Sequence, residues 1–344
     1  MTPADRPVRL GIVGVGAWAR SNHLPAVETH PGAHVVAACD VDPAALAAAA
    51  RDFGVPCVTT DLDELLAQDL DALIVSTPNE HHHGPALAGL QAGLHVLVEK
   101  PMALRADQAW QLSAEAERRG RHVMVPLGWN FTEMTAAARA LMHNGSVGEV
   151  ELVMVHMASP MRDSMLAAWQ AWPGDAEIPA SQGYAFSQLP HALGVALWLT
   201  GLRAEQVMAD YRPSPLGPDL SAALSVRFAG GAVGAVSGTA FCGPPGDYHL
   251  EVRVHGSGGL LTWDAEVGRE RLMLHTAAGR QERTFPRSSG AYDGRPPVRR
   301  FIDLVRGEPV ANDAPAELSA RVSELLEAAA RAAGTGAPAR VVLP

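Results

Sequence analysis

The sequence has 344 residues, 47% of them hydrophobic and 19% charged, and it carries a formal net charge of −10 at pH 7. Because one hydrophobic core rarely serves a chain of this length, we expect a soluble globular protein with two domains. The negative charge argues against a nucleic acid or an anionic membrane as a partner, and no apolar run approaches the roughly 18 residues that a membrane span requires.

The terminus and the cysteines predict a cellular location. Residues 1–7 are polar and lack the apolar core of a signal peptide. The three cysteines, Cys39, Cys57 and Cys242, are scattered along the chain and odd in number. This usage predicts reduced thiols in a cytoplasmic protein.

A glycine-rich stretch follows the first apolar run. Residues 8–13 are short, β-branched and bounded by proline and glycine, as is typical of a buried strand. Gly14-x-Gly16-x-x-Ala19 then matches the dinucleotide-binding pattern G-x-G-x-x-G/A, whose small residues permit a tight turn, close approach of a pyrophosphate and packing of the next helix. The alternative is an ordinary tight turn. In a dinucleotide site, the loop residues against the cofactor are Gly14, Val15, Gly16, Ala17 and Trp18.

An acidic residue ends the second expected strand. We expect a helix over residues 17–30 and a strand over 35–39, after which Asp40 follows the glycines by about 20 residues. A carboxylate there accepts hydrogen bonds from the adenosine ribose and repels a 2′-phosphate, so NAD is favoured over NADP. The alternative role for Asp40 is a helix cap, but Asp42 is better placed because Pro43 takes the first helical position.

Strands and helices alternate up to residue 125. The expected helices cover 44–53, 61–68, 85–92 and 107–119, and the expected strands cover 55–58, 72–75, 96–98 and 122–125. This alternation predicts an α/β fold with a doubly wound parallel sheet and a ligand at the carboxyl ends of the strands. The loops at those ends hold Gly16, Asp40, Thr77, Pro78, Lys100, Trp129 and Asn130.

Three consecutive histidines, residues 81–83, raise the question of a metal site. Adjacent side chains diverge, and no second cluster of histidine and cysteine completes a ligand set. We therefore expect no metal, one histidine (His82) facing the cofactor cleft, and two solvated histidines.

The tripeptide Glu99-Lys100-Pro101 carries the first chemical signal. A lysine at the mouth of a parallel sheet, next to a nicotinamide, can hydrogen-bond a substrate hydroxyl and stabilise a developing alkoxide. The alternative is a surface lysine paired with Glu99.

Order and spacing of the motifs now resemble one family, the Gfo/Idh/MocA oxidoreductases. The matching segments are Gly14-Val-Gly16 with His23 downstream, Thr77-Pro78-Asn79-x-x-His82, Ala92-Gly93-x-His95-Val-Leu-Val-Glu99-Lys100-Pro101, Gly128-Trp129-Asn130 and Gly145-x-x-Gly148-Glu149. The resemblance implies NAD(P)-dependent oxidation or reduction of a sugar, cyclitol or similar polyol, with Lys100 contacting the substrate. It also implies that the bond before Pro101 is often cis.

The same resemblance implies two domains. Residues 1–126 would form a Rossmann domain, and residues 127–344 an α+β domain with an open, mostly antiparallel sheet for substrate binding and oligomerisation, its last helices packing partly back on the first domain. The cofactor site would include Ser76, Thr77, Pro78, His82, Glu99, Lys100 and Asn130 in addition to the glycine loop and Asp40.

Tryptophans mark the start of the second half. Residues 150–157 alternate as a strand, and residues 158–182 are expected to be irregular. A loop this long is usually functional, and tryptophans suit the face of a sugar or a nicotinamide. We therefore count Trp129 and Trp172 among the substrate residues; the alternative is a loop that packs on the core.

Residues 183–201 carry the second chemical signal. They resemble the family's helix that presents a catalytic histidine, which here is His191. A neutral imidazole suits abstraction of a hydroxyl proton; the alternative is a buried structural histidine. Many family members have an aspartate one turn earlier, where this chain has Ser187 followed by Gln188. Both are expected to contact the substrate, but the departure puts inositol-type or glucose-type specificity in doubt.

From residue 205 the hydrophobic period becomes two. The expected strands cover 207–211, 220–228, 234–240, 249–255, 259–263 and 271–275, followed by helices over 298–305 and 315–333 and a terminal strand over 341–343. This pattern predicts an antiparallel sheet with one face against helices. By resemblance, the other face would join subunits into a homodimer or homotetramer.

Three functions are compatible with these residues. The first is an NAD-dependent dehydrogenase of a secondary alcohol, in which Lys100 polarises the reacting oxygen and His191 exchanges its proton. The second uses tightly held NAD for an epimerisation, or for oxidation, elimination and reduction, with no net redox change. The third is a dinucleotide-sensing regulatory protein, against which the presence of both Lys100 and His191 argues.

Overall fold

The computed structural model describes residues 6–172, 177–243 and 246–342. The chain forms two compact units. The first unit comprises Met1–Gly128 and Asp293–Ala320, and the second comprises Trp129–Tyr292 and Arg321–Pro344. Among the described residues, no helix is both long and apolar enough to cross a membrane.

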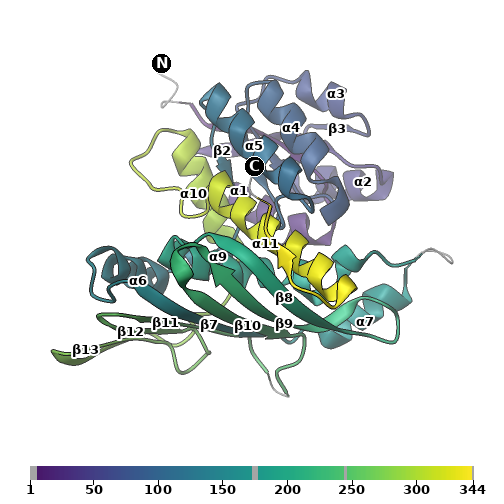
Figure 1. Ribbon diagram of the computed structural model, residues 1–344. Helices are drawn as coiled ribbons and strands as arrows, with labels where there is room; N and C mark the ends of the chain where they lie inside the picture. The colour runs from purple at the N-terminus through teal and green to yellow at the C-terminus, as the bar shows by residue number, and fades with distance from the viewer. Residues whose placement is uncertain (1–5, 173–176, 244–245, 343–344) are drawn as a thin grey trace. The chain divides into compact units, whose positions relative to one another are not determined.

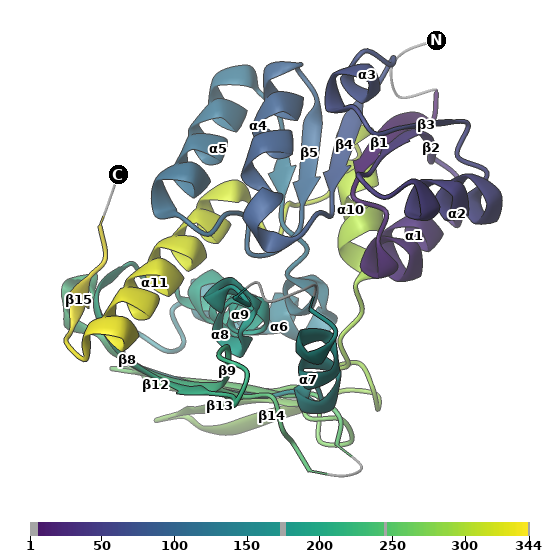
Figure 2. The same cartoon turned by 90° about the vertical axis from the view of Figure 1, so that its right-hand side faces the viewer.

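The first unit is built on a parallel six-stranded sheet in the order β3-β2-β1-β4-β5-β6 (Figures 1 and 2). Its strands are β1 (Val8–Val13), β2 (Ala33–Cys39), β3 (Cys57–Thr59), β4 (Ala72–Val75), β5 (His95–Val98) and β6 (Val123–Met124). The central strands are buried along their length because helices cover both faces. The order reverses between β1 and β4, so their carboxyl ends form the crevice in which such sheets bind ligands.

The helices of the first unit follow local signals in the sequence. They are α1 (Leu24–Glu28), α2 (Pro43–Phe53), α3 (Leu62–Leu66), α4 (His83–Gln91), α5 (Ala106–Arg119) and α10 (Arg295–Val305). The Asp42 side chain caps α2 by accepting the Ala44 N–H, with Pro43 in the first helical turn, as expected. The predicted helix over 17–30 is instead a π-helical turn (Ala19–His23) followed by the short α1, and the predicted strand over 122–125 keeps only two residues.

The second unit contains a nine-stranded sheet in the order β14-β13-β12-β11-β7-β10-β9-β8-β15. Its strands are β7 (Val150–Ala158), β8 (Ala204–Pro213), β9 (Asp219–Phe228), β10 (Val233–Thr239), β11 (His249–Gly256), β12 (Gly259–Asp264), β13 (Arg271–Thr276), β14 (Gly279–Thr284) and β15 (Ala339–Arg340). Every pair is antiparallel except β7 with β10. The predicted fold class, a parallel Rossmann sheet followed by a mostly antiparallel sheet, is confirmed.

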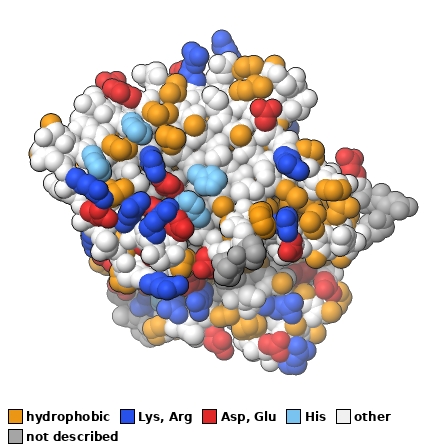
Figure 3. All heavy atoms as spheres, turned by 90° about the horizontal axis from the view of Figure 1, so that it is seen from below, with side chains coloured by type: hydrophobic (Ala, Val, Ile, Leu, Met, Phe, Trp, Pro, Cys, Tyr) orange, Lys and Arg blue, Asp and Glu red, His pale blue; other side chains and the backbone are white. Residues whose placement is uncertain are grey.

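Helices lie on one face of this second sheet. They are α6 (Glu133–His143), α7 (Arg162–Gln170), α8 (Tyr184–Ser187) and α9 (Leu189–Thr200), and α11 (Ala316–Thr335) begins in the first unit and continues into the second. The side chains that alternate away from these helices form an open face on which hydrophobic, acidic, basic and histidine side chains are interspersed (Figure 3).

Several predictions for the second unit are corrected. Residues 158–182 are not all irregular, because α7 occupies part of them. Helix α6 and the edge strand β14, whose residues are all exposed, were not predicted. The terminal strand lies at Ala339–Arg340 rather than over 341–343, and Leu343 lies outside the described residues.

Candidate functional site

The glycine loop of the first unit has the shape that a phosphate group requires. Gly14 has a φ of +84°, and a Cβ at this position would overlap the carbonyl oxygen of Ser76. Only glycine fits there without strain. A Cβ on Gly16 would meet nothing within 4 Å, so the backbone at this point faces open space. A dinucleotide pyrophosphate fits this arrangement, because the loop is tight at Gly14 and open at Gly16.

Asp40 ties this loop to the end of β2. Its Oδ2 accepts the Val15 N–H at 2.8 Å, and its Oδ1 accepts the Asp42 N–H at 3.0 Å. The side chain does not cap α2, since Asp42 does so. Each carboxylate oxygen has a second lone pair, so Asp40 has acceptor capacity for a ribose hydroxyl as well.

His82 holds the loop that follows β4. His82 is 1% exposed, and its Nδ1 and Nε2 lie 2.7 Å from the Pro101 carbonyl oxygen and 2.8 Å from the Thr77 carbonyl oxygen. Burial lowers the pKa of this imidazole. The ring thus bridges two protein loops instead of pointing into open space. Of its neighbours, His81 is exposed, and His83 is half-buried with its Nε2 2.8 Å from Oε1 of Gln111 on α5, so only one of the two histidines expected to be solvated is fully exposed.

Glu99 directly follows β5 and is a buried carboxylate that contacts three other residues. Its Oε1 accepts the indole N–H of Trp18 at 2.7 Å and lies 3.0 Å from Nε2 of the buried His23, while its Oε2 accepts the Lys100 backbone N–H at 3.1 Å. Burial alone would raise the pKa of Glu99, but the His23 hydrogen bond and charge, the Lys100 charge and the Trp18 hydrogen bond outweigh it and lower the pKa to about 2. Glu99 is therefore an anion throughout the physiological range.

Lys100 stands next to this anion, and its peptide bond to Pro101 is cis. Burial lowers the pKa of the Lys100 ammonium, and the Glu99 charge opposes that shift. A compositional signal supports its importance: Lys100 is the only lysine among the 27 lysine and arginine residues of the sequence. A chain that uses arginine everywhere else needs an amine here for a reason other than solubility.

The second unit contributes a cluster of four aromatic rings, Trp129, His191, Tyr248 and Tyr292, which we call the aromatic cluster. His191 is buried and packs edge-on against Trp129 and Tyr292, with ring centroids 5.4 and 4.9 Å away. Trp129 is fixed by donating its indole N–H to the Gly290 carbonyl at 2.8 Å. The two tyrosines were missed in the sequence because they lie in turn regions far from residue 191 in the chain.

Ser187 and Gln188 lie at the break between α8 and α9. Gln188 leaves helical geometry, with a φ of −120°, and its carbonyl accepts the His191 N–H at 3.1 Å. A carboxylate does reach this segment, although from another element: Asp219 on β9 accepts the Ala185 N–H at 2.9 Å. Burial raises the pKa of Asp219 to about 6.

The predicted site residues are thus divided between the units. The first unit holds Gly14, Val15, Gly16, Ala17, Trp18, Asp40, Ser76, Thr77, Pro78, His82, Glu99 and Lys100, and the second holds Trp129, Asn130, Trp172, Ser187, Gln188 and His191. Asn130 is buried next to Trp129 in the 3-10 turn Gly128–Phe131. Trp172 is half-buried after α7, and no ring contact joins it to the aromatic cluster in the described parts of the chain.

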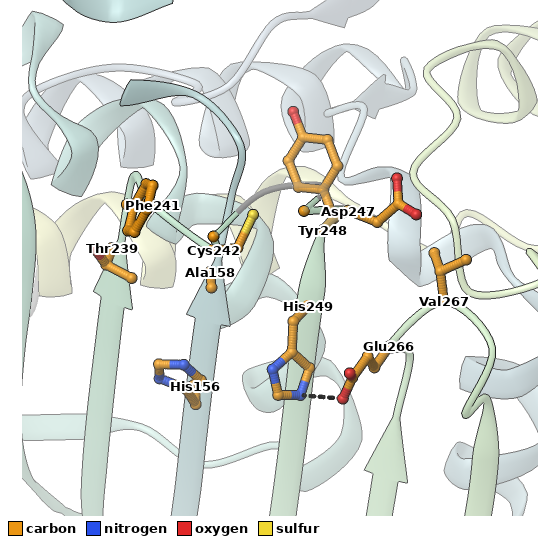
Figure 4. Close-up of a pocket in the computed structure, with 12 residues that line it drawn as sticks. His156, Ala158, Thr239, Phe241, Cys242, Asp247, Tyr248, His249, Glu266 and Val267 are labelled. Carbon is orange, nitrogen blue, oxygen red and sulfur yellow. Dashed lines mark ion pairs between the residues drawn. The ribbon is translucent and has the colours of Figure 1, made fainter. Parts of the chain in front are cut away.

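A second hollow, of about 600 Å³, lies near the ends of β7, β10 and β11 (Figure 4). Tyr248 and His249 point to opposite sides there, as neighbours in an extended chain do. Nε2 of His249 lies 3.8 Å from both Asp264 Oδ1 and Glu266 Oε2. Arg269 pairs with both carboxylates, at 2.9 and 2.5 Å, and Arg271 lies 3.5 Å from Asp264, so two cations face the two carboxylates and we assign no metal to this group.

Two family models match the chain. Residues 8–127 match the model described as an oxidoreductase family with an NAD-binding Rossmann fold (GFO_IDH_MocA). Residues 135–262 match the model of the GFO/IDH/MocA C-terminal domain. The two matches together cover most of both units.

Individual proteins match as well. A 1-carboxy-3-chloro-3,4-dihydroxycyclohexa-1,5-diene dehydrogenase of Comamonas testosteroni is 33% identical over 147 residues, which are 42% of this chain and 37% of that protein. The match thus spans little more than a third of that relative's length. Inositol 2-dehydrogenase of Acidothermus cellulolyticus is 27% identical over 300 residues, covering 84% of this chain and 82% of that protein. The solved WlbA dehydrogenase of Chromobacterium violaceum, in complex with NADH and UDP-GlcNAcA, shares the fold with a TM-score of 0.79 at 24% identity, over 100% of this chain and 98% of its own.

Proposed function

The chain belongs to the Gfo/Idh/MocA oxidoreductase family, and from this premise we propose that it is an NAD-dependent dehydrogenase of a secondary alcohol in a sugar, cyclitol or glycoside. The observation that carries the proposal is the position of Lys100. Lys100 is the only lysine of the sequence, and it directly follows β5. In the sheet, β5 lies two strands from β1, which leads into the glycine loop, and the strand order reverses between β1 and β4, where such sheets bind ligands.

The cofactor would lie against the glycine loop and Asp40, and it would accept or supply the hydride. In alcohol oxidation, the Lys100 ammonium would donate a hydrogen bond to the reacting oxygen and stabilise the alkoxide character that develops there. His191 would take the hydroxyl proton, which a neutral imidazole does well near pH 7. Trp129 holds the ring of His191 edge-on, which limits the directions in which it can accept.

The substrate class rests on the relatives. The curated relative aligned over 82% of its length is an inositol 2-dehydrogenase, and the WlbA dehydrogenase was solved with a nucleotide sugar. We propose a polyhydroxylated ring for this chain too. Ser187 and Gln188 would bind its hydroxyl groups without the charge of the aspartate that many family members carry, so the preferred sugar or cyclitol should differ from theirs.

A substrate screen tests the proposal. Purified protein would be mixed with NAD and a panel of cyclitols, aldoses, glycosides and uronic acids, and NADH formation followed by absorbance at several pH values. Turnover of one ring polyol that disappears in the Lys100 and His191 variants supports the proposal. A complete lack of NADH formation and of the reverse reaction, in protein that binds NAD, would sink it.

The departure at Ser187 also favours a second candidate, in which NAD stays bound and the reaction has no net redox change. Because Ser187 replaces the aspartate that would hold an imidazolium, the oxidised product is better consumed on the enzyme than released. Epimerisation, or oxidation, elimination and reduction, would then convert substrate while NADH does not accumulate. Mass analysis of the products alongside NADH absorbance separates the two candidates.

We expect Asp40 to set the cofactor preference. Changing Asp40 to serine removes the negative charge that repels a 2′-phosphate. The ratio of kcat/KM for NAD to kcat/KM for NADP should therefore fall by about tenfold or more, because repulsion between two negative charges in a partly buried site costs more than about 1.4 kcal/mol. Steady-state kinetics with both cofactors measure the ratio. An unchanged ratio would mean that Asp40 serves only the Val15 and Asp42 amides.

We also propose a cytoplasmic homodimer or homotetramer formed through the open face of the nine-stranded sheet. Met154 on β7 and Val233 on β10 are 42% and 48% exposed on this face. Exposed apolar side chains are unfavourable in water, and a subunit interface would bury them. Met154→Arg should reduce the mass measured by light scattering to that of a smaller species. Val58→Arg is the matched control, because Val58 is 41% exposed on β3 of the first unit. If the wild-type protein is already monomeric, the proposal fails.

A further inference from the structure

Glu270 is a buried carboxylate of the second unit that the proposed chemistry does not use. It lies in the turn between β12 and β13 and is 4% exposed. Its Oε2 accepts the Gly268 N–H at 2.8 Å, and its Oε1 accepts the Ser288 N–H from a segment 18 residues further along the chain. Burial of a carboxylate is costly unless hydrogen bonds compensate for it, so Glu270 joins these two turns firmly.

Ser288 stands in a strained turn. Its φ is +69°, and among the described residues it is the one residue other than glycine with a positive φ. A side chain in this conformation is unfavourable because its Cβ crowds the backbone, so the surrounding structure must hold the turn. The Ser288 side chain is exposed, so its own packing does not do this. The hydrogen bond from its N–H to a charged oxygen of Glu270 does.

The segment after this turn reaches the aromatic cluster. A Cβ on Gly290 would lie 2.9 Å from the backbone of Ala265, so the two backbones are in close contact. The Gly290 carbonyl accepts the indole N–H of Trp129 at 2.8 Å. Two residues later, the ring of Tyr292 lies 4.9 Å from the rings of both Trp129 and His191. The segment therefore supplies one ring of the cluster and holds a second one in place.

We propose that Glu270 is a positioning residue for His191. By accepting the Ser288 N–H, Glu270 holds the strained turn, and the turn fixes Trp129 and Tyr292. These are the two rings against which the imidazole packs edge-on, with centroids 5.4 and 4.9 Å away, so their positions limit how the imidazole can rotate. The proposal rests on the proposed role of His191 as the group that takes the hydroxyl proton.

The hydrogen bond from Trp129 to Gly290 makes the proposal measurable without a substrate. In ¹⁵N-labelled protein each tryptophan gives one indole N–H signal, and Trp129→Phe identifies the signal of Trp129. Its exchange with deuterated solvent, followed by NMR, reports how often the segment releases this N–H. Trp263 on β12 is 0% exposed and belongs to the same unit, so its indole N–H, identified with Trp263→Phe, reports general opening of the sheet.

Glu270→Ala removes both acceptor oxygens. The Trp129 indole N–H should then exchange about tenfold faster or more, the scale of a lost hydrogen bond to a charged group, while the rate at Trp263 is unchanged. Glu266→Ala is the matched control, because Glu266 is an acidic residue of the same turn whose carboxylate pairs with Arg269 instead. It should leave both exchange rates as in the wild-type protein.

Ser288→Gly tests whether Glu270 acts through the strained turn. Glycine adopts a positive φ without the crowding that a side chain causes, so the turn no longer depends on the carboxylate. In the double variant Glu270→Ala with Ser288→Gly, the Trp129 exchange rate should return most of the way to the wild-type value. If Glu270→Ala does not fold, Glu270→Gln, which keeps one acceptor oxygen, gives the same comparison with and without Ser288→Gly.

The imidazole itself provides the second measurement. The C–H signals of His191, identified with His191→Gln, depend on the ring currents of Trp129 and Tyr292, because both rings lie against it. These signals should shift in Glu270→Ala and return in the double variant. With a turned-over substrate, kcat should fall in Glu270→Ala while KM for NAD is unchanged.

Three results would overturn the proposal. The first is an unchanged Trp129 exchange rate or unchanged His191 signals in Glu270→Ala. The second is equal acceleration at Trp129 and Trp263, which would mean general loosening of the unit. The third is no recovery in the double variant. If the NMR results are as expected but no polyol is oxidised, the proposed function fails, and the connection of Glu270 to the aromatic cluster stands.

Discussion

Replacing Lys100 by methionine will lower kcat on the true substrate by about 10²-fold or more, the scale of a lost acid–base group. Methionine keeps the length of the side chain and removes only the ammonium, so the alkoxide that develops during hydride transfer loses its hydrogen-bond donor. Glu99 keeps the contacts with His23, Trp18 and the backbone, so the buried carboxylate is not left without donors. The measurement is single-turnover and steady-state NADH formation with saturating NAD and substrate.

Lys100→Arg is the control for charge. Arginine remains a cation but carries a planar, wider group whose donors cannot reproduce the position of an amine, so activity should be only partly retained. NAD affinity, measured by fluorescence titration, should fall far less than kcat in both variants, because Gly14, Gly16 and Asp40 are untouched and Lys100 is only one of the residues expected to contact the cofactor. Normal turnover by Lys100→Met would remove this residue from the mechanism and leave His191 as the sole acid–base candidate.

Much of the first unit was predictable because its signals are local. The cap at Asp42 with Pro43, the acidic residue after β2 and the strand–glycine–helix pattern each depend on a few adjacent residues. The π-helical turn Ala19–His23 is a different case. His23 contacts Glu99, which follows β5, and a contact of that kind depends on the completed sheet rather than on local sequence.

The second unit was harder to predict for two physical reasons. Strand β14 is entirely exposed, so it has no buried face and no alternation; its pairing with β13 alone defines it. Helix α6 begins after Thr132, whose side chain accepts the Thr135 N–H as an N-terminal cap. This cap is visible in the sequence, but it lies between two glycine motifs and was not interpreted as the start of a helix. A threonine cap followed by an amphipathic segment of this length is enough to predict a helix.

The site shows the same division. Residues in motifs were found, whereas Tyr248, Tyr292 and Asp219 reach the neighbourhood of His191 or Gln188 only through the packing of the second unit. One overlooked signal was global rather than local. A count of the sequence shows that Lys100 is its only lysine and that every other residue of this type is arginine. The count therefore points to the same residue as the Glu99-Lys100-Pro101 motif.

The two glycines of the loop should separate folding from cofactor binding. Gly14→Ala places a methyl group against the Ser76 carbonyl at a φ of +84°, and the left-handed conformation alone costs about 1 to 2 kcal/mol, so the free energy of unfolding of the first unit should fall by more than about 2 kcal/mol. Gly16→Val adds its side chain in open space, so stability should change little. That open space is where a pyrophosphate would approach the backbone, so NAD affinity should fall by about 10²-fold.

Chemical denaturation and NAD titration of both variants measure the two effects separately. The contrast is the test, because a loop that merely turns the chain would make Gly16→Val harmless in both assays. Equal loss of stability in the two variants would mean that the space beside Gly16 is filled in solution. Retained NAD affinity in a folded Gly16→Val protein would place the cofactor elsewhere. The proposed roles of Asp40 and Lys100 would then fail as well, because both assume that the cofactor lies against the glycine loop.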